Sequence, residues 1–210
     1  MSPYPRNLLP TALGRLVGPK FSVPVPVRSS LHRDALVQSA LDPSVESIGF
    51  VGAAYFQGEP IALNITTISR DGIGYYLDIA EERVLRDIDC EGLWLLSIEE
   101  RGLTALERSA TDILREPLHS NCRMIWKHRG ERVAASDQFE ALRILSDDGP
   151  QRLGNLCRLA RLSESEVLSM ACQDLVGADI YSARLGRNTM ISRRDRLMPP
   201  PPRVLFWADE

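Results

Sequence analysis

Lysine is nearly absent from this chain of 210 residues: only Lys20 and Lys127 occur, so 23 of its 25 basic residues are arginine. A catalytic centre that needs a lysine ammonium can therefore obtain one from two positions only. Apolar runs of the ~20 residues that a membrane-spanning helix needs are also missing. Pro3, Pro5 and Pro10 interrupt any apolar region of a signal peptide. We expect a cytoplasmic protein without a membrane partner.

Paired cysteines and the usual catalytic motifs are missing as well. The four cysteines are widely spaced, with no CxxC pair and no cysteine–histidine spacing typical of zinc, so free thiols in a reducing compartment are expected. No Ser–His–Asp order and no glycine-rich phosphate loop is present. What remains is a globular composition, 44% hydrophobic and 25% charged, sized for one domain or for one domain and a small second module.

Charge is unevenly distributed along the chain. Residues 1–33 carry five basic residues and no acid, and residues 184–203 carry six arginines against one acid. The segment 34–183 holds the remaining 14 basic residues and 25 acids. Basic ends on an acidic body indicate arms that touch phosphate or an acidic partner. The alternative is that these arginines merely keep the ends soluble.

An apolar hairpin organises the first half of the sequence. Strands are predicted over 60–69 and 74–80, rich in Val, Ile, Thr and Tyr, around an Asp-Gly turn. Asn64 and Asp78 are polar residues inside these apolar strands, where they cost free energy unless they find partners. We expect Asp78 to be a structural hydrogen-bond acceptor with Asn64 as its partner across the hairpin.

The other elements of the first half are predicted from stop signals and apolar patterning. Residues 1–28 form a basic, proline-rich and irregular arm, in which 21–27 is at most an edge strand. A helix begins at an N-cap, Ser29 or Ser30, carries His32 on its surface and ends at Pro43. The remaining elements are strands beginning at 45 and over 90–98, and helices over 104–114 and 119–127. Residues 29–132 are therefore predicted as an α/β layer arrangement.

The second half, residues 136–196, has the pattern of a winged helix-turn-helix. Asp137 caps a first helix, 151–160 is a second, and Ser163 with Glu166 forms the capping box of a third. Strands over 178–183 and 189–194 then form a wing. The third helix carries acids and no basic residue, so we predict that it does not read the major groove. The expected nucleic-acid-binding residues are those of the wing: Arg184, Arg187, Arg193, Arg194 and Arg196. A dimer or partner module is the alternative.

The tail, residues 197–210, combines a stiff spacer with an apolar end. Four consecutive prolines favour an extended backbone. Beyond them Leu205, Phe206 and Trp207 would be costly to leave in solvent. We expect them to bind a protein partner, the alternative being that they fold back on their own domain.

Taken together, the chain resembles the TnsA-type transposon endonucleases, in which a PD-(D/E)XK nuclease-like domain precedes a winged helix. The similarity rests on RSSLHRDALVQSALDPSVESIGF, the hairpin, LWLLSIEERG, GPQRLGNLCRLA and GADIYSARLGRNTMISR. It implies a restriction-endonuclease-like mixed sheet with flanking helices for 29–132. It also implies a divalent metal held by carboxylates on the hairpin, beside a lysine that polarises the attacking water.

The positions that the resemblance assigns to this chemistry have changed. His32 stands where the family has a glutamate, Asn64 where it has the metal-binding aspartate, and Ala80 where it has the lysine; Asp78 alone keeps its carboxylate. We therefore expect a vestigial site without a cofactor. The prediction is a catalytically silent adaptor that associates with DNA and a protein partner. Two alternatives stay open: a Mg²⁺-dependent endonuclease that uses Asp78 and Glu82, and a transcriptional regulator that binds DNA as a homodimer.

Overall fold

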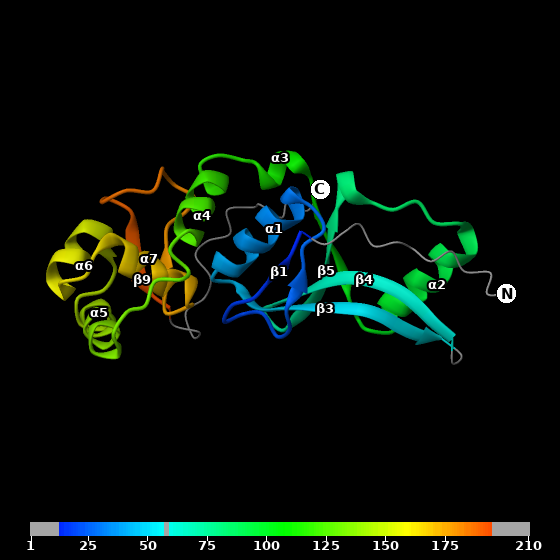
Figure 1. Ribbon diagram of the computed structural model, residues 1–210, viewed down its shortest axis with the longest axis horizontal. Coiled ribbons are helices and arrows are strands. Elements are labelled where there is room, and N and C mark those ends of the chain that lie inside the picture. Colours follow the sequence, from blue (N-terminus) through cyan, green and yellow to red (C-terminus); the bar gives the residue numbers. More distant parts are fainter. Residues whose placement is uncertain (1–12, 57–58, 195–210) are drawn as a thin grey trace.

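The computed structural model describes residues 13–56 and 59–194, and a mixed four-stranded sheet lies at the centre of its first half (Figure 1). The strands follow one another in space as β3-β4-β5-β6. The first three are antiparallel neighbours, while β6 runs parallel to β5. Their bounds are β3 Val45–Phe56, β4 Glu59–Arg70, β5 Ile73–Ile79 and β6 Thr104–Arg108. The predicted α/β class with a mixed sheet is confirmed.

The β4–β5 hairpin forms where the sequence predicts it. Asp71 and Gly72 take the left-handed backbone at φ 52° and 75°, and Arg70 pairs with Ile73 across the turn. Two consecutive residues with positive φ match the right-handed twist of the flanking strands, and Asp-Gly tolerates that backbone best. The turn chemistry thus sets the register of the strand that carries Asp78.

Helices cover both faces of this sheet. Helix α1 (Ser30–Leu41) is N-capped by Ser29, as predicted, and packs with Ile68 and Leu77 in the main core. Helix α2 (Ile88–Glu99) packs with Ile65 and Tyr76 in a smaller cluster. Because Tyr76 and Leu77 point to opposite faces of β5, the two helices lie on opposite sides of the sheet.

The prediction of a buried strand over 90–98 is wrong, because these residues belong to helix α2. Asp87 caps the helix through the backbone N–H of Cys90 at 2.8 Å. Trp94 and Ile98 face the sheet, while Leu95 is exposed. Apolar residues on both sides hide the helical period, and a short continuous apolar run does not distinguish a strand from a helix.

The segment predicted as one helix over 104–114 is also different. It divides at Ser109 into strand β6 and a short helix, α3 (Ala110–Ile113), which begins with a capping box between Ser109 and Asp112. Residues 104–108 favour a helix by composition, but pairing with β5 overrides this weak preference. The next helix, α4 (Leu118–Trp126), agrees with the prediction for 119–127.

Residues 13–28 are packed rather than irregular. Strands β1 (Arg15–Leu16) and β2 (Val25–Pro26) pair antiparallel, and Phe21 bridges to Ile48 of β3. Lys20 is buried, although it was expected to belong to a basic arm. The irregular arm predicted for 1–28 therefore does not extend to these residues, and residues 1–12 lie outside the described part of the chain.

The second half consists of helices and a small sheet of strand order β7-β9-β8, both pairs of which are antiparallel. In chain order the elements are α5 Ala135–Asp147, β7 Gln151–Arg152, α6 Leu153–Ala160, α7 Glu164–Cys172, β8 Val176–Ala178 and β9 Met190–Arg193. The predicted capping box of Ser163 and Glu166 is confirmed at the start of α7.

Three local predictions in this half are wrong. Helix α5 begins after Ala134, so Asp137 lies in its first turn rather than at its N-cap. Residues 151–152 form a strand before α6 begins. The strand expected over 178–183 lies instead at β8 and ends before Asp179, whose carboxylate accepts backbone N–H groups from Tyr181 and Ser182, both at 3.1 Å. This side-chain turn competes with strand pairing.

One hydrophobic core extends through both halves. Helix α4 packs between α1 and α7 and contributes the fully buried Ile125 (Figure 1). A group of buried charges reinforces the joint: the Asp174 carboxylate pairs with the Lys20 ammonium at 3.7 Å and with the Arg194 guanidinium. Arg194 also donates to the carbonyl oxygen of Pro43 at 2.9 Å. The second half is therefore joined to the first through α1, α4 and this group of charges.

Candidate functional site

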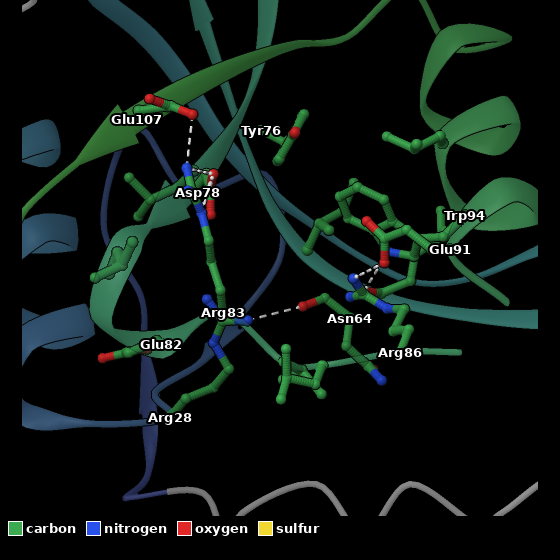
Figure 2. A pocket seen from close by; sticks show the side chains of 17 residues that line it. Arg28, Asn64, Tyr76, Asp78, Glu82, Arg83, Arg86, Glu91, Trp94 and Glu107 are labelled. Atoms are coloured by element: carbon green, nitrogen blue, oxygen red, sulfur yellow. Dashed lines mark hydrogen bonds and ion pairs between the residues drawn. The ribbon is translucent and has the colours of Figure 1, made fainter. Parts of the chain in front are cut away.

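A pocket of about 480 Å³ lies on the α2 side of the sheet, lined also by the segment that joins β5 to α2 (Figure 2). Its floor comes from β4, β5 and β6, and one wall comes from α2. Both charged and apolar side chains line it. Those used below are Arg28, Asn64, Tyr76, Asp78, Glu82, Arg83, Arg86, Glu91, Trp94 and Glu107.

Asn64 occupies a bulge in β4. The register between β3 and β4 shifts between Val51 and Ala53, and Asn64 takes φ 51°. Asparagine tolerates this left-handed backbone better than the apolar residues around it, which explains a polar residue in this strand. The carbonyl oxygen of Asn64 accepts a hydrogen bond from Arg28 Nη1 at 3.2 Å. The bulge thus anchors the residue that precedes α1.

The carboxylate of Asp78 is bound by an arginine. Arg83 donates from Nε at 2.9 Å and from Nη2 at 2.6 Å to the Asp78 Oδ2 atom, and Nη2 also reaches Glu107 Oε1 at 2.6 Å. The hydrogen bond to Asp78 raises the pKa of Arg83. No hydrogen bond joins Asp78 to Asn64 in the described segments, so the expected partner was wrong. Asp78 is a hydrogen-bond acceptor, but its donor is Arg83.

The register of the sheet explains this bridge. Asp78 of β5 pairs directly with Glu107 of β6, so the two carboxylates lie side by side on the same face. Such neighbours repel unless a cation lies between them. Arg83, five residues beyond Asp78, supplies that cation from the turn after η1 (Ala80–Glu82) (Figure 2).

Arg28 is a second guanidinium at the pocket. Burial lowers the pKa of Arg28, while the negative charges of Glu82 and Asp78 raise it. Its Nε atom is buried and has no hydrogen-bond partner in the described part of the chain. The Glu82 carboxylate accepts a hydrogen bond from the Ser29 hydroxyl. Because η1 begins at Ala80, Glu82 is directed toward the start of α1 rather than placed by strand alternation.

Arg86 and Trp94 hold the second end of segment 83–87, which joins β5 to α2. The Arg86 guanidinium lies 4.4 Å from the centroid of the Trp94 ring and pairs with Glu91 at 3.0 Å. Tyr76 packs edge-on against Trp94 with ring centroids 5.3 Å apart. Burial, and then the charge of Asp78, raises the pKa of Tyr76. Segment 83–87 is therefore held at both ends by arginines.

His32 supports the pocket from within the core. It is 1% exposed, so the expectation of a surface histidine was wrong. Its Nδ1 atom accepts the backbone N–H of Arg28 at 3.2 Å, which leaves Nε2–H to donate to Thr66 Oγ1 at 3.0 Å. Burial, and then the charge of Arg28, lowers the pKa of His32 to about 3. The imidazole is thus neutral at pH 7.

The residues at these positions do not fit a magnesium ion. Hard cations need several oxygens, preferably charged ones. Asp78 is occupied by Arg83, Asn64 offers a neutral amide, and Ala80 brings no ammonium. Over 13–56 and 59–194, no group of three or more His, Cys, Asp or Glu residues converges to hold a metal.

Sequence reasoning had missed Arg83, Arg86, Trp94 and Glu107. Arg83 and Arg86 lie beyond the predicted strand, in a segment without helical or strand periodicity. The pattern of apolar residues therefore did not single them out. Glu107 was placed on a helix, and Trp94 on a strand. The one available signal was the Glu-Glu-Arg run directly after the Asp78 strand, which brings a cation within reach of that carboxylate.

The predicted wing arginines differ in their surroundings. Arg184 and Arg187 are exposed, and Arg187 lies 3.5 Å from Glu164 in an ion pair. Arg193 is exposed and donates to the Ser146 hydroxyl. Arg194 is 11% exposed and is engaged with Asp174, so we remove it from the set offered to nucleic acid. Outside the described residues lie Arg196, Leu205, Phe206 and Trp207.

Helix α7 is buried over most of its length. Residues 167–172 are all buried, and the helix packs against α4 and α1. Only its acidic first turn, with Glu164 and Ser163, is exposed. The exposed part of α7 therefore presents carboxylates and no basic group, and the expectation that this helix does not read the major groove stays a prediction.

A scan against protein-family models and a search of curated proteins found no match to this chain. The described helices are all too short or too polar to cross a bilayer.

Proposed function

We propose that this chain is a catalytically inactive, nuclease-like adaptor that associates with DNA in a mobile element or regulatory complex. The observation that carries the proposal is the Arg83 bridge between Asp78 and Glu107. In an endonuclease of the type that the sequence resembles, this strand would hold a metal and a lysine. Here a guanidinium neutralises the surviving carboxylate, and Ala80 has no group that could polarise water.

The second half supplies the proposed contact with DNA. The order α5, β7, α6, α7, β8, β9 supports a winged helix-turn-helix. Because α7 is buried, contact would fall to the loop between β8 and β9, which carries Arg184 and Arg187. Exposed arginines of this kind bind phosphates and contribute affinity rather than base recognition.

The chain itself holds this loop in shape. Asn121 of α4 donates to the carbonyl oxygens of Ile180 at 2.9 Å and Ala183 at 2.8 Å. Its own side-chain oxygen accepts the backbone N–H of Leu185 at 2.8 Å. Three bonds from one buried amide therefore fix the loop that presents Arg184. A protein partner at Leu205, Phe206 and Trp207, and a homodimer, remain further parts of the proposal.

The experiment that tests the proposal combines cleavage and binding on the same plasmid DNA. With Mg²⁺ or Mn²⁺ the wild-type protein should leave the plasmid intact, as should Asp78→Ala. Cleavage by the wild type that Asp78→Ala abolishes would refute the inactive site. Arg83→Ala tests the alternative function, an active metal-dependent endonuclease, because the substitution leaves Asp78 and Glu107 without their cation. A gain of Mn²⁺-dependent cleavage in that variant would favour an endonuclease held inactive by Arg83.

The binding part measures mobility shifts at several salt concentrations. Arg184→Ala combined with Arg187→Ala should weaken binding about tenfold and lower the salt slope by about two, since each lost phosphate contact contributes about one. Arg143→Ala is the matched control. Arg143 is also an exposed arginine of this half, but it pairs with Glu140 at 2.7 Å and Asp147 at 2.9 Å. Equal losses in both variants would count against a wing contact.

A further inference from the structure

Helix α2 has an apolar face that nothing in the described chain covers. Ile88 is 91% exposed and Leu95 is 50% exposed, and Leu85, just before the helix, is 99% exposed. Leu96 is exposed beside Leu95. Residues 88, 92, 95 and 99 recur at helical spacing along one stripe. The opposite side of the same helix already packs on the sheet through Trp94. We call the exposed stripe of Leu85, Ile88, Gly92, Leu95 and Leu96 the outer face of α2. Leu85 and Leu95 also line the pocket described above, so this face begins at the rim of the pocket.

Gly92 lies in the middle of this outer face, and no contact within the described segments requires a glycine there. A Cβ atom added there would meet no atom within 4 Å. Glycine inside a helix costs stability relative to alanine. The packing of α2 does not require a glycine at this position, because a larger side chain would have room. The position therefore suits the close approach of another backbone.

Acidic residues lie at both ends of the outer face. Asp89 occupies the first turn, and Glu99 and Glu100 occupy the last turn and the C-cap. Carboxylates in the first turn favour a helix, but carboxylates at its carboxyl end oppose the helix dipole. No basic residue lies in the last turn of α2. Arg101, just beyond the C-cap, donates to the carbonyl oxygen of Ser97 at 3.2 Å, so two carboxylates face one guanidinium at this end. The carboxyl end of α2 therefore carries more negative charge than the stability of the helix requires.

We infer that the outer face of α2 is a docking surface for a basic amphipathic helix of a partner protein. The apolar side of that helix would cover Ile88 and Leu95 and approach closely at Gly92, while its Lys or Arg residues would face Asp89 and Glu99. Recognition of this kind uses anchors at helical spacing in an apolar groove or face. Nucleic acid does not fit, because the carboxylates would repel phosphate.

A second copy of this chain fits less well for an electrostatic reason. In a contact of two copies through this face, the Asp89, Glu99 and Glu100 carboxylates of both copies would lie in the same interface. Surfaces of like charge brought together in this way destabilise such a contact. A basic partner instead neutralises the carboxylates at both ends of the helix.

The probe for the test is a fluorescein-labelled synthetic helix of about 18 residues, with Leu at helical spacing and Lys elsewhere. The control probe has Glu in place of each Lys. Anisotropy titrations of the full chain should show at least tenfold tighter binding of the Lys peptide. Ile88→Ser with Leu95→Ser should weaken it about tenfold, as should Asp89→Lys with Glu99→Lys. Phe139→Ser is the matched control, because Phe139 is an exposed apolar residue of α5.

Gly92→Gln separates docking from helix stability. The substitution should raise the melting temperature of the free chain, since glutamine favours helices over glycine, yet weaken peptide binding by filling the point of close approach. Failure of the Lys peptide to bind, equal binding of both peptides, or unchanged binding by Gly92→Gln would overturn the inference. A wild-type dimer in light scattering that Ile88→Ser with Leu95→Ser dissociates would also overturn it, because a second copy would then cover the face.

Discussion

The buried imidazole of His32 makes the stability of this protein fall as the pH is lowered from neutral. In the folded chain its pKa is lowered to about 3 from the ordinary 6.5, because burial excludes the charged form. The unfolded chain therefore takes up a proton below pH 6.5 that the folded chain refuses. Stability from this group is complete above pH 6.5, and it is lost as the pH falls from there toward 3.

The size of the effect follows from the difference between the pKa values of His32 in the unfolded and folded chain and from the pH range compared. Each pH unit below 6.5 costs about 1.4 kcal/mol, so a change from pH 7.5 to pH 5.0 removes about 2 kcal/mol of unfolding free energy. Carboxylates contribute little over this range, because in unfolded chains they titrate near pH 4. A loss of about 2 kcal/mol is a large part of the 5–15 kcal/mol typical of a domain.

Urea unfolding at the two pH values measures this loss. The comparison is between the wild type and His32→Gln, whose amide can accept from Arg28 and donate to Thr66 without titrating. At pH 7.5 the variant should be less stable by about 1 kcal/mol, the scale of a disturbed hydrogen bond. Between pH 7.5 and 5.0 it should lose about 2 kcal/mol less than the wild type.

A half-buried histidine provides the control for the loss of an imidazole. His128→Gln removes one such ring just beyond α4, and its urea unfolding is compared with that of His32→Gln at both pH values. Nuclear magnetic resonance of the His32 ring gives an independent measure. A His32 signal that titrates near pH 6.5, or equal pH dependence in His32→Gln and the wild type, would refute the reasoning.

Three further predictions concern local structure. Asn121→Ala should cost about 2–3 kcal/mol in unfolding free energy measured with urea, because it strips partners from backbone groups of the β8–β9 loop; a cost below 0.5 kcal/mol would show that the loop does not depend on this amide. Ser29→Ala should cost about 1 kcal/mol by losing the N-cap of α1, and an unchanged urea midpoint would contradict that role. In the native protein at pH 7, a thiol reagent should modify the half-buried Cys90 much faster than the buried Cys122, whose pKa is raised by burial. Peptide mapping over time measures the two rates, and equal rates would contradict the packing around α4.

Local signals predicted the hairpin and the helix caps at Ser29 and Ser163. The Asp-Gly turn fixes the β4–β5 register by backbone preference, and the serines at 29 and 163 satisfy N–H groups within three residues of themselves. Interactions this short in sequence need no knowledge of the remaining chain, which is why prediction and structure agree there. The polar Asn64 was also correctly singled out, although its reason is the bulge rather than a bond to Asp78.

The candidate site could be foreseen only in part, because its partners come from separate elements. Asp78 was predicted as an acceptor, but its environment depends on Glu107, which reaches it through parallel pairing of β5 with β6. That pairing in turn requires α2 to be a helix, and an apolar run without a clear period does not reveal it. An error at 90–98 therefore concealed half of the pocket.

The sequence alone determined the turns, the caps, the scarcity of lysine and the absence of an ammonium at residue 80, since each depends on a residue's identity or its nearest neighbours. Tertiary structure decided that His32 is buried, that α2 leaves an apolar face uncovered, and that Arg83 lies between Asp78 and Glu107. The physical reason is that burial and ion pairing depend on which distant segments meet, and a chain's local pattern does not contain that information.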